Sequence, residues 1–203
     1  MSTPLPKSVH NQVAQAESQD KSQLGFWIYL MTDCVLFASL FATYAVLRHN
    51  TYGGPSAHEL FRPGYALIET LLLLTSSFTC GLMTIAVRQG KRQLVVMLLI
   101  ITGLLGLVFL GMEISEFHKL AVDGDSWRRS GFLSAFFTLV GTHGLHILSG
   151  LLWLTVLLWN SARRGLTTVT SKRLLLFSLF WHFLDLVWIF IFTFVYMLGV
   201  LGA

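Results

Sequence analysis

Residues 94–117 read LVVMLLIITGLLGLVFLGMEISEF, a run of 24 residues in which the first charged side chain is Glu113. A helix rises ~1.5 Å per residue and the hydrocarbon core of a bilayer is ~30 Å thick, so about 20 apolar residues suffice to cross it. Lipid cannot satisfy backbone polar groups, and a run of this length must therefore form a helix there. The stretch predicts a transmembrane helix.

Four further stretches are also apolar and long enough to cross a bilayer, and none shows the alternation that is typical of a transmembrane barrel strand. The chain of 203 residues has a mean hydropathy of +0.67 and only 12% charged residues, values that exclude an ordinary soluble domain. The sequence predicts an all-α, polytopic membrane protein that is a bundle of five transmembrane helices, with spans at about 24–47, 65–87, 94–117, 131–159 and 174–201.

The chain divides into a polar N-terminal tail, residues 1–23, and a transmembrane domain, residues 24–203. The tail contains Pro4 and Pro6 and no apolar run, which predicts a flexible segment and not a cleaved signal peptide. Lys and Arg number nine in the tail and the second and fourth loops, against five in the first and third loops. This excess predicts a cytoplasmic N-terminus and a periplasmic C-terminus. The net charge of +4 therefore reflects membrane topology, and no nucleic-acid partner is expected.

Eight ionisable side chains lie inside these apolar spans. A charge near the bilayer centre costs at least ~2.5–3.5 kcal/mol, so such side chains usually face protein or water and often mark function. Six of them form three pairs with i, i+3 spacing, which places both members of a pair on one face of a helix. The pairs are Glu113/Glu116, His143/His146 and His182/Asp185, and the remaining two residues are Asp33 and Glu69.

Depth along the spans separates these residues into two groups. Under the expected topology, Glu69, Glu113 and Glu116 lie toward the outer surface. The other five lie in overlapping inner and middle layers. The three glutamates and Asp33 are candidates for proton uptake or for contact with lipid headgroups. The alternative for Asp33 is a purely structural role, and the alternative for Glu113 and Glu116 is a hydrated helix end. Asp33 has no basic residue within its own span, so it either takes a partner from another helix or stays neutral.

The histidines allow more than one interpretation. His143 and His146 could ligate a metal or a haem, because imidazole suits iron, copper and zinc. They could equally be hydrogen-bonded to Asp, to Thr142 or to backbone carbonyls. A di-iron bundle needs Glu-x-x-His on two helices, whereas here the Glu pair and the His pair lie on separate spans, so no metal site is expected. The pair His182/Asp185 is interpreted as a charge-assisted contact within one helix, which makes these histidines and Asp185 a buried polar network.

Four motifs together resemble subunit III of the haem-copper respiratory oxidases. They are GFWIYLMTD at 25–33, GMEISEF at 111–117, GTHGLH at 141–146 and WHFLDLVW at 181–188. The likeness runs from about residue 24 to the end of the chain. Mitochondrial-type subunit III has seven helices, and five spans resemble the form found in bacterial bo-type ubiquinol oxidases. The position of Asp33 is usually Glu in the cytochrome c oxidase branch, so the acid is retained with a shorter reach.

This resemblance implies an accessory subunit that is not itself an enzyme, within a proton-translocating complex that oxidises ubiquinol and reduces oxygen to water. Haem and copper would belong to subunit I, with no cofactor in this chain. The implied partners are subunits I, II and IV and membrane lipids, including a bound phospholipid. The implied location is the bacterial cytoplasmic (inner) membrane. Asp33 is the position that the resemblance connects with sustained proton uptake by subunit I.

Three other functions remain open. Subunit III of a cytochrome c oxidase is the nearest alternative, because nothing in this chain selects the electron donor. A stand-alone proton-coupled transporter would explain the buried acids, but the chain lacks inverted repeats and proline-broken spans. A membrane quinone reductase with two haems would explain the histidines, but it requires facing His pairs that are not evident.

Overall fold

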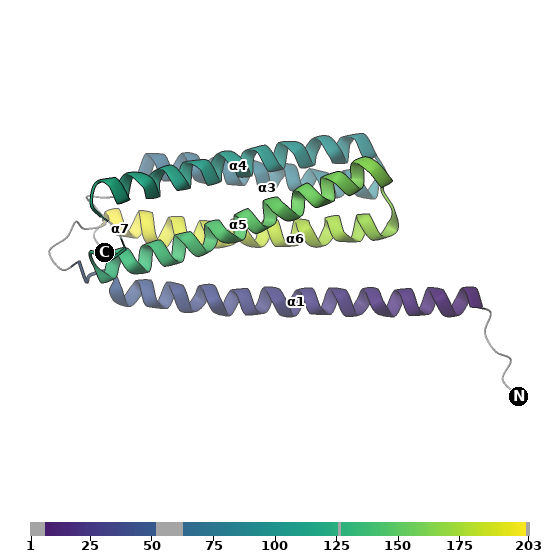
Figure 1. Cartoon of the computed structure of the whole chain (residues 1–203), viewed down its shortest axis with the longest axis horizontal. Helices are drawn as coiled ribbons and strands as arrows, with labels where there is room; N and C mark the ends of the chain where they lie inside the picture. The colour runs from purple at the N-terminus through teal and green to yellow at the C-terminus, as the bar shows by residue number, and fades with distance from the viewer. Residues whose placement is uncertain (1–6, 52–62, 126, 202–203) are drawn as a thin grey trace, which may run out of the picture. The chain divides into compact units, whose positions relative to one another are not determined.

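The computed structural model describes residues 7–51, 63–125 and 127–201, most of which are helical (Figure 1). Within these residues, five helices are long and apolar enough to cross a membrane, which confirms the prediction of an all-α membrane protein with five spans. The membrane-length segments are Gln23–Leu47, Gly64–Arg88, Arg92–Val122, Gly131–Arg164 and Thr168–Met197.

Helix α1 spans Lys7–Leu47 and so begins inside the segment that the sequence assigns to a flexible tail. Residues 7–24 contain no Pro or Gly, and half of them are Gln, Ala, Lys or Glu, which favour a helix. Residues 7–23 are therefore helical and continuous with the first span. Their flexibility stays a prediction, and residues 1–6 lie outside the described part of the chain. Met1–Ala38 forms one compact unit and Ser39–Ala203 a second.

The second unit is built on four antiparallel helices. Helix α3 packs against α4 and α6, and α5 packs against the same two helices, so together they form a closed up-down-up-down bundle (Figure 1). Their bounds are Pro63–Arg88 for α3, Arg92–Val122 for α4, Gly131–Arg164 for α5 and Thr168–Ile191 for α6. The chain continues from α6 directly into a π-helix, η1, at Phe192–Met197, and a last turn, α7, at Leu198–Leu201.

Local signals fix both ends of α5. At its start, the Ser130 side chain accepts a hydrogen bond from the Leu133 backbone N–H at 3.2 Å, an N-cap that satisfies one free donor of the first turn. At its end, Gly165 has φ 74°, a left-handed conformation that favours glycine. Arg92 of α4 also donates to the Ser161 carbonyl at 3.1 Å and thereby occupies an acceptor of the last turn. These contacts hold the long helix in register with α4.

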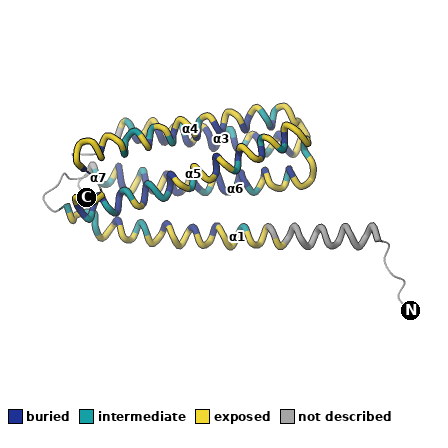
Figure 2. The backbone as a smooth tube through the Cα atoms, in the orientation of Figure 1, coloured by how far each residue is buried: buried dark blue, intermediate teal, exposed yellow. Residues whose placement is uncertain are grey.

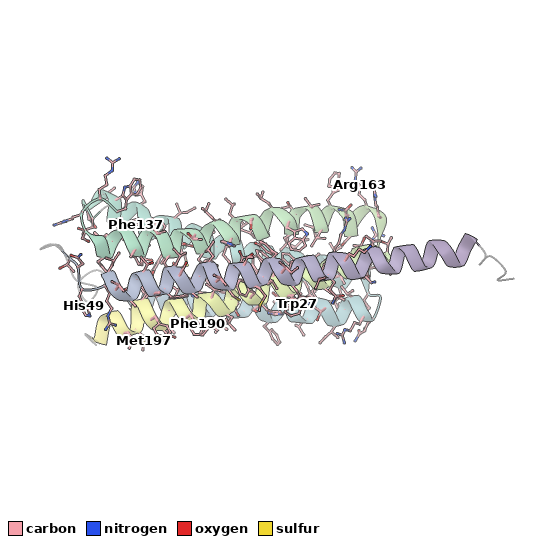
Figure 3. The ribbon with its side chains drawn as sticks, turned by 90° about the horizontal axis from the view of Figure 1, so that it is seen from below. Trp27, His49, Phe137, Arg163, Phe190 and Met197 are labelled. Atoms are coloured by element: carbon pink, nitrogen blue, oxygen red, sulfur yellow. The ribbon has the colours of Figure 1, made fainter. Side chains whose placement is uncertain are left out.

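Buried residues of α3, α4, α5 and α6 lie mainly on the sides of these helices that face one another, and exposed residues lie mainly on the outward sides (Figure 2). Many exposed side chains are large and apolar, as expected for a surface that lipid covers. Arg163 lies at one end of the bundle and Met197 at the other (Figure 3). The Arg163 guanidinium lies 4.0 Å from the ring centroid of Trp159, a pairing typical of the membrane–water interface.

The bundle is held at close distance by an indole that lies against two glycines. Trp181 of α6 is 1% exposed and donates through Nε1 to the Ser76 hydroxyl of α3 at 3.0 Å. A Cβ atom added to Gly106 of α4 would lie 2.9 Å from this indole, and one added to Gly150 of α5 would lie 3.0 Å from it. The missing side chains therefore make the space that Trp181 occupies, as small residues commonly do between membrane helices.

Candidate functional site

Three carboxyl groups gather inside the second unit, and we refer to Glu69, Glu113 and Glu116 as the acidic cluster. Glu69 comes from α3, and the other two lie one turn apart on α4. Glu69 is 0% exposed and Glu113 is 2% exposed, while Glu116 is half-buried. The three groups are close enough to interact electrostatically. The structure thus brings together, from two helices, the acids that the sequence places at a similar depth.

The C-terminal π-helix supplies a hydrogen-bond donor to this cluster. The hydroxyl of Tyr196, a fully buried side chain of η1, donates to Glu116 Oε2 at 2.9 Å. Both carboxyl oxygens of Glu69, and Oε2 of Glu113, have no hydrogen-bond partner within the described residues. A buried polar group left without a partner costs ~1–3 kcal/mol, so these acids are expensive to keep and their retention points to a function.

A glycine of α5 makes room for the acidic cluster, and an aromatic contact lies next to this glycine in the sequence. A Cβ atom at Gly144 of α5 would lie 2.7 Å from Glu113 Oε1, so the absence of a side chain there makes room for the carboxyl group. The neighbouring His143 stacks on Trp188 with ring centroids 5.4 Å apart, and its ring lies edge-on to Phe109 at 6.0 Å. His143 is therefore positioned by α4 and α6, one residue before the glycine that meets Glu113, although the sequence groups it by depth with His182 and Asp185.

Glu69 and Glu116 lie in different environments, so replacing each of them by Met should have different effects on stability. Glu69→Met removes a buried carboxyl that has no hydrogen-bond partner within the described residues and should leave the unfolding temperature of the purified protein unchanged or raised, because an apolar side chain of similar size replaces a desolvated polar one. Glu116→Met deletes the acceptor of the Tyr196 hydroxyl and should lower stability by about 1 kcal/mol. Thermal unfolding of both variants in the same detergent tests the contrast, and destabilisation by Glu69→Met equal to that by Glu116→Met would contradict it.

A second polar group lies between α3 and α6. The Ser77 hydroxyl of α3 is 2.6 Å from His182 Nδ1, and Ser77 also interacts with Asp185. A hydroxyl can accept from an imidazole N–H and donate to a carboxyl oxygen at once. The sequence interpretation of a direct charge-assisted pair stays a prediction, and His182 Nδ1 is hydrogen-bonded to Ser77 on the facing helix. His182 and Asp185 still interact electrostatically.

The remaining candidate positions have local partners. His146 Nδ1 donates to the Thr142 carbonyl at 2.7 Å, one of the backbone bonds that the sequence allows. Asp33 belongs to the first unit, and the Tyr29 side chain one turn earlier on α1 is hydrogen-bonded to it, so its partner comes from its own helix. Within the described residues, no three His, Cys, Asp or Glu side chains are grouped so that they could hold a metal ion.

Sequence reasoning missed the hydroxyl-bearing side chains that organise both polar groups. Besides Ser77 and Tyr196, Thr70 of α3 accepts a hydrogen bond from Trp188 Nε1 at 3.1 Å. The signal was present in α3, where TSSFT at 75–79 interrupts an apolar run. Hydroxyls within a membrane span commonly hydrogen-bond across helices, so this cluster predicts that one face of α3 lies inside the bundle.

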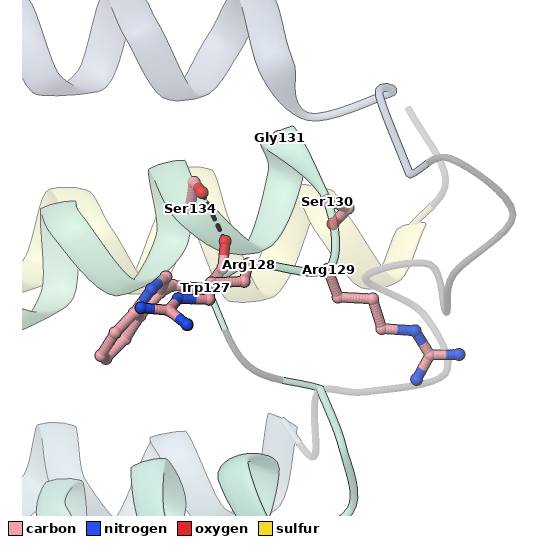
Figure 4. A pocket seen from close by; sticks show the side chains of 6 residues that line it. All are labelled: Trp127, Arg128, Arg129, Ser130, Gly131 and Ser134. Carbon is pink, nitrogen blue, oxygen red and sulfur yellow. Dashed lines mark hydrogen bonds between the residues drawn. The ribbon is translucent and has the colours of Figure 1, made fainter.

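A hollow of about 510 Å³ lies where the chain enters α5 (Figure 4). The Arg128 guanidinium lies 6.0 Å from the Trp127 ring centroid, and the Ser134 hydroxyl donates to the Trp127 carbonyl at 2.5 Å. Arg129 points away from this pair and forms an ion pair with Asp125 (Figure 4). A basic and aromatic surface at the end of a span is typical of the interface with lipid headgroups.

Comparison with known proteins agrees with this architecture. The family model of cytochrome c oxidase subunit III matches residues 8–200. The chain is 52% identical over 192 residues to cytochrome bo(3) ubiquinol oxidase subunit 3 of Pseudomonas aeruginosa, covering 95% of this chain and 92% of that protein. It is 48% identical over 188 residues to quinol oxidase subunit 3 of Bacillus subtilis, covering 93% and 92%. It is 47% identical over 179 residues to cytochrome c oxidase subunit 3 of a Bacillus species, covering 88% and 86%. The chain belongs to the cytochrome c oxidase subunit III family.

Proposed function

We propose that this chain is the accessory subunit III of a proton-translocating haem-copper oxidase that uses ubiquinol as its electron donor. The observation that carries the proposal is a family match over residues 8–200, joined to 52% identity with a ubiquinol oxidase subunit 3 over nearly the whole of both chains. The five membrane-length helices are compatible with this role. Its partners are then subunits I, II and IV of the complex, and its place is the inner membrane of a bacterium.

The experiment that tests this role is purification of the tagged chain from its native membrane in mild detergent. We expect a large partner to co-purify and to hold all the haem and copper, with none on the chain after it is separated. Haem that stays on the separated chain would overturn the proposal and make His143, His146 and His182 the ligand candidates. A chain that purifies alone and metal-free would instead favour a transporter.

The electron donor needs a separate test, because a cytochrome c oxidase subunit 3 is almost as similar to this chain as the quinol oxidase subunits are. The purified complex should consume oxygen with a ubiquinol analogue and not with reduced cytochrome c. Oxygen consumption with cytochrome c would assign the chain to the other branch and leave the accessory role intact.

Within the complex, we assign Asp33 to sustained proton uptake by subunit I. The support is an acid well inside a membrane span, hydrogen-bonded to Tyr29 and with no basic residue on its own span. The acidic cluster is a second candidate for proton handling, because Glu69 and Glu113 are buried with carboxyl oxygens that lack hydrogen-bond partners within the described residues.

This role predicts a specific defect for Asp33→Ala. We expect the variant to assemble and to start at the normal rate, and then to lose activity progressively during turnover, because the removed acid no longer supports proton delivery. Oxygen consumption by the purified complex, followed over many turnovers and at raised pH, measures the decay. Asp33→Glu is the matched control, since it keeps the carboxyl group and should decay as slowly as the native complex. Equal decay of all three proteins would contradict the assignment.

Lipid binding and orientation belong to the same proposal. The Trp127 and Arg128 surface is suited to the phosphate of a phospholipid, since a guanidinium carries the opposite charge and an indole favours the membrane interface. The nine-to-five distribution of Lys and Arg supports a cytoplasmic N-terminus. One of the five, Arg62, lies outside the described residues. This orientation puts the Trp127 surface on the periplasmic side.

A further inference from the structure

A groove of about 480 Å³ runs along the outer surface between α3 and α6. We refer to it as the α3–α6 groove. Ser77 and Gly81 of α3 lie within it, and His182 and Asp185 of α6 line its other side. Its apolar rim on α3 extends over twelve residues from Leu74 to Ile85, a length of ~17 Å along a helix. The groove therefore has the dimensions of a helix contact, in the middle of the hydrophobic surface.

Polar atoms in this groove lack hydrogen-bond partners. Asp185 is 8% exposed, and its Oδ1 has no partner within the described residues. The side chain of His182 is exposed, and its Nδ1 is hydrogen-bonded to the Ser77 hydroxyl. Its Nε2 forms no hydrogen bond within the part of the chain that the structure describes. If Nδ1–H donates to Ser77, Nε2 of the exposed His182 is an acceptor that the groove presents to whatever covers it, while Oδ1 of Asp185 is itself buried.

Lipid chains do not fit this chemistry. Both side chains lie within the membrane-length segment Thr168–Met197, where acyl chains offer no hydrogen-bond donor and leaving polar groups unpaired is costly. A donor that reaches this depth must come from a side chain on another membrane helix or from a ligand dissolved in the membrane. The length of the apolar rim favours a helix, because a small ring would occupy only part of it.

The backbone of α3 also permits a close approach. Ser77 and Gly81 have the small-xxx-small spacing that allows membrane helices to pack tightly, and Phe78 and Leu82 beside them are exposed apolar ridges. A Cβ atom at Gly81 would meet only the His182 ring, at 3.9 Å, so the space above this glycine is open to a partner. We propose that the α3–α6 groove seats a transmembrane helix of another oxidase subunit, and that this helix carries a hydrogen-bond donor at the level of His182 and Asp185.

This inference rests on the proposed function, since it names where a partner subunit binds, and one experiment separates the two. A photo-crosslinking amino acid, p-benzoylphenylalanine, replaces Phe78, whose side chain is 66% exposed at the groove. Native membranes are irradiated, the tagged chain is purified, and the adduct is identified by mass spectrometry. We expect the band of the chain to shift to the summed mass of two polypeptides, with the adduct on a membrane span of another subunit.

The matched controls replace Gly81, which lies in the groove, by a large or a small side chain. In the same photo-crosslinking chain, Gly81→Leu should abolish the shifted band, whereas Gly81→Ala should retain it. An adduct with lipid or quinone alone, with a second copy of this chain, or with residues 7–38 of the same chain would overturn the inference. So would the absence of any protein adduct. The haem and copper that co-purify with the tag report separately on the proposed function, which stands if they are present and the crosslink is absent.

Discussion

Gly106→Val is expected to prevent the chain from reaching its native packing. A Cβ atom at this position of α4 would lie 2.9 Å from Cζ2 and Cη2 of Trp181, closer than real side-chain carbons approach. The indole has nowhere to move, because it is buried against Gly150 on α5 and is hydrogen-bonded to Ser76 on α3. Overpacking of a tight core costs ~1–3 kcal/mol and more where the neighbour is rigid, and valine adds two further methyl groups here.

The matched control for Gly106→Val is Gly111→Val on the same helix. No atom lies within 4 Å of a Cβ at Gly111, so the same substitution meets open space and should be tolerated. The measurement is the yield of monodisperse chain, and of chain co-purified with its partner, together with the unfolding temperature in detergent. Equal yields and unfolding temperatures for the two variants would show that the α4–Trp181 contact is looser than the structure describes.

Trp188→Ala is expected to produce the largest loss of stability by truncation. Trp188 is fully buried, donates to Thr70, stacks on His143, and lies edge-on to Phe109 at 4.7 Å between ring centroids. Removing the indole leaves a cavity among α3, α4 and α5, and large-to-small changes of this kind cost ~3–5 kcal/mol. Because His143 directly precedes Gly144, which makes room for Glu113, we expect oxidase activity of any assembled complex to fall as well.

Trp159→Ala is the matched control for the indole truncation. Trp159 lies near the end of α5, is 59% exposed and contacts Arg163 at the surface, so its removal leaves no enclosed cavity. We expect the unfolding temperature of this variant to remain close to that of the native protein. A Trp188→Ala protein as stable as Trp159→Ala would contradict the packing described for the bundle interior.

The spans were predictable because each is a continuous apolar run, and length alone identifies such runs. The predicted segment 94–117 lies inside α4, and the other four predicted spans likewise correspond to membrane-length helices. The extent of α1 was not predictable from hydropathy, since a polar segment free of Pro and Gly can continue a helix beyond the membrane. Helix ends outside the bilayer depend on propensity, which hydropathy does not measure.

The polar groups could be predicted as residues but not as arrangements. The spacing of Glu113 and Glu116 correctly placed both acids on one face of α4, but nothing in the sequence specified Tyr196 as the donor to Glu116. The pairing of His182 with Asp185 was inferred from spacing within one helix, and nothing in the sequence indicated that His182 contacts Ser77 of the facing helix. Contacts across helices depend on the rotation of each helix about its axis, and a single sequence does not encode that rotation visibly.

The π-helix Phe192–Met197 has a consequence for how this region can change in length during evolution. A π-helical turn accommodates one residue more than an α-helical turn, so deletion of one residue there could be absorbed by reversion to α-helix without breaking the backbone ladder. If the extra residue were present without the π-helix, it would turn every later residue by ~100° about the helix axis relative to the preceding span. Tyr196 would then leave the carboxyl group of Glu116. Sequence length in this segment is thus coupled to helix type, and lineages that lose the extra residue should keep the tyrosine contact only where this turn is α-helical.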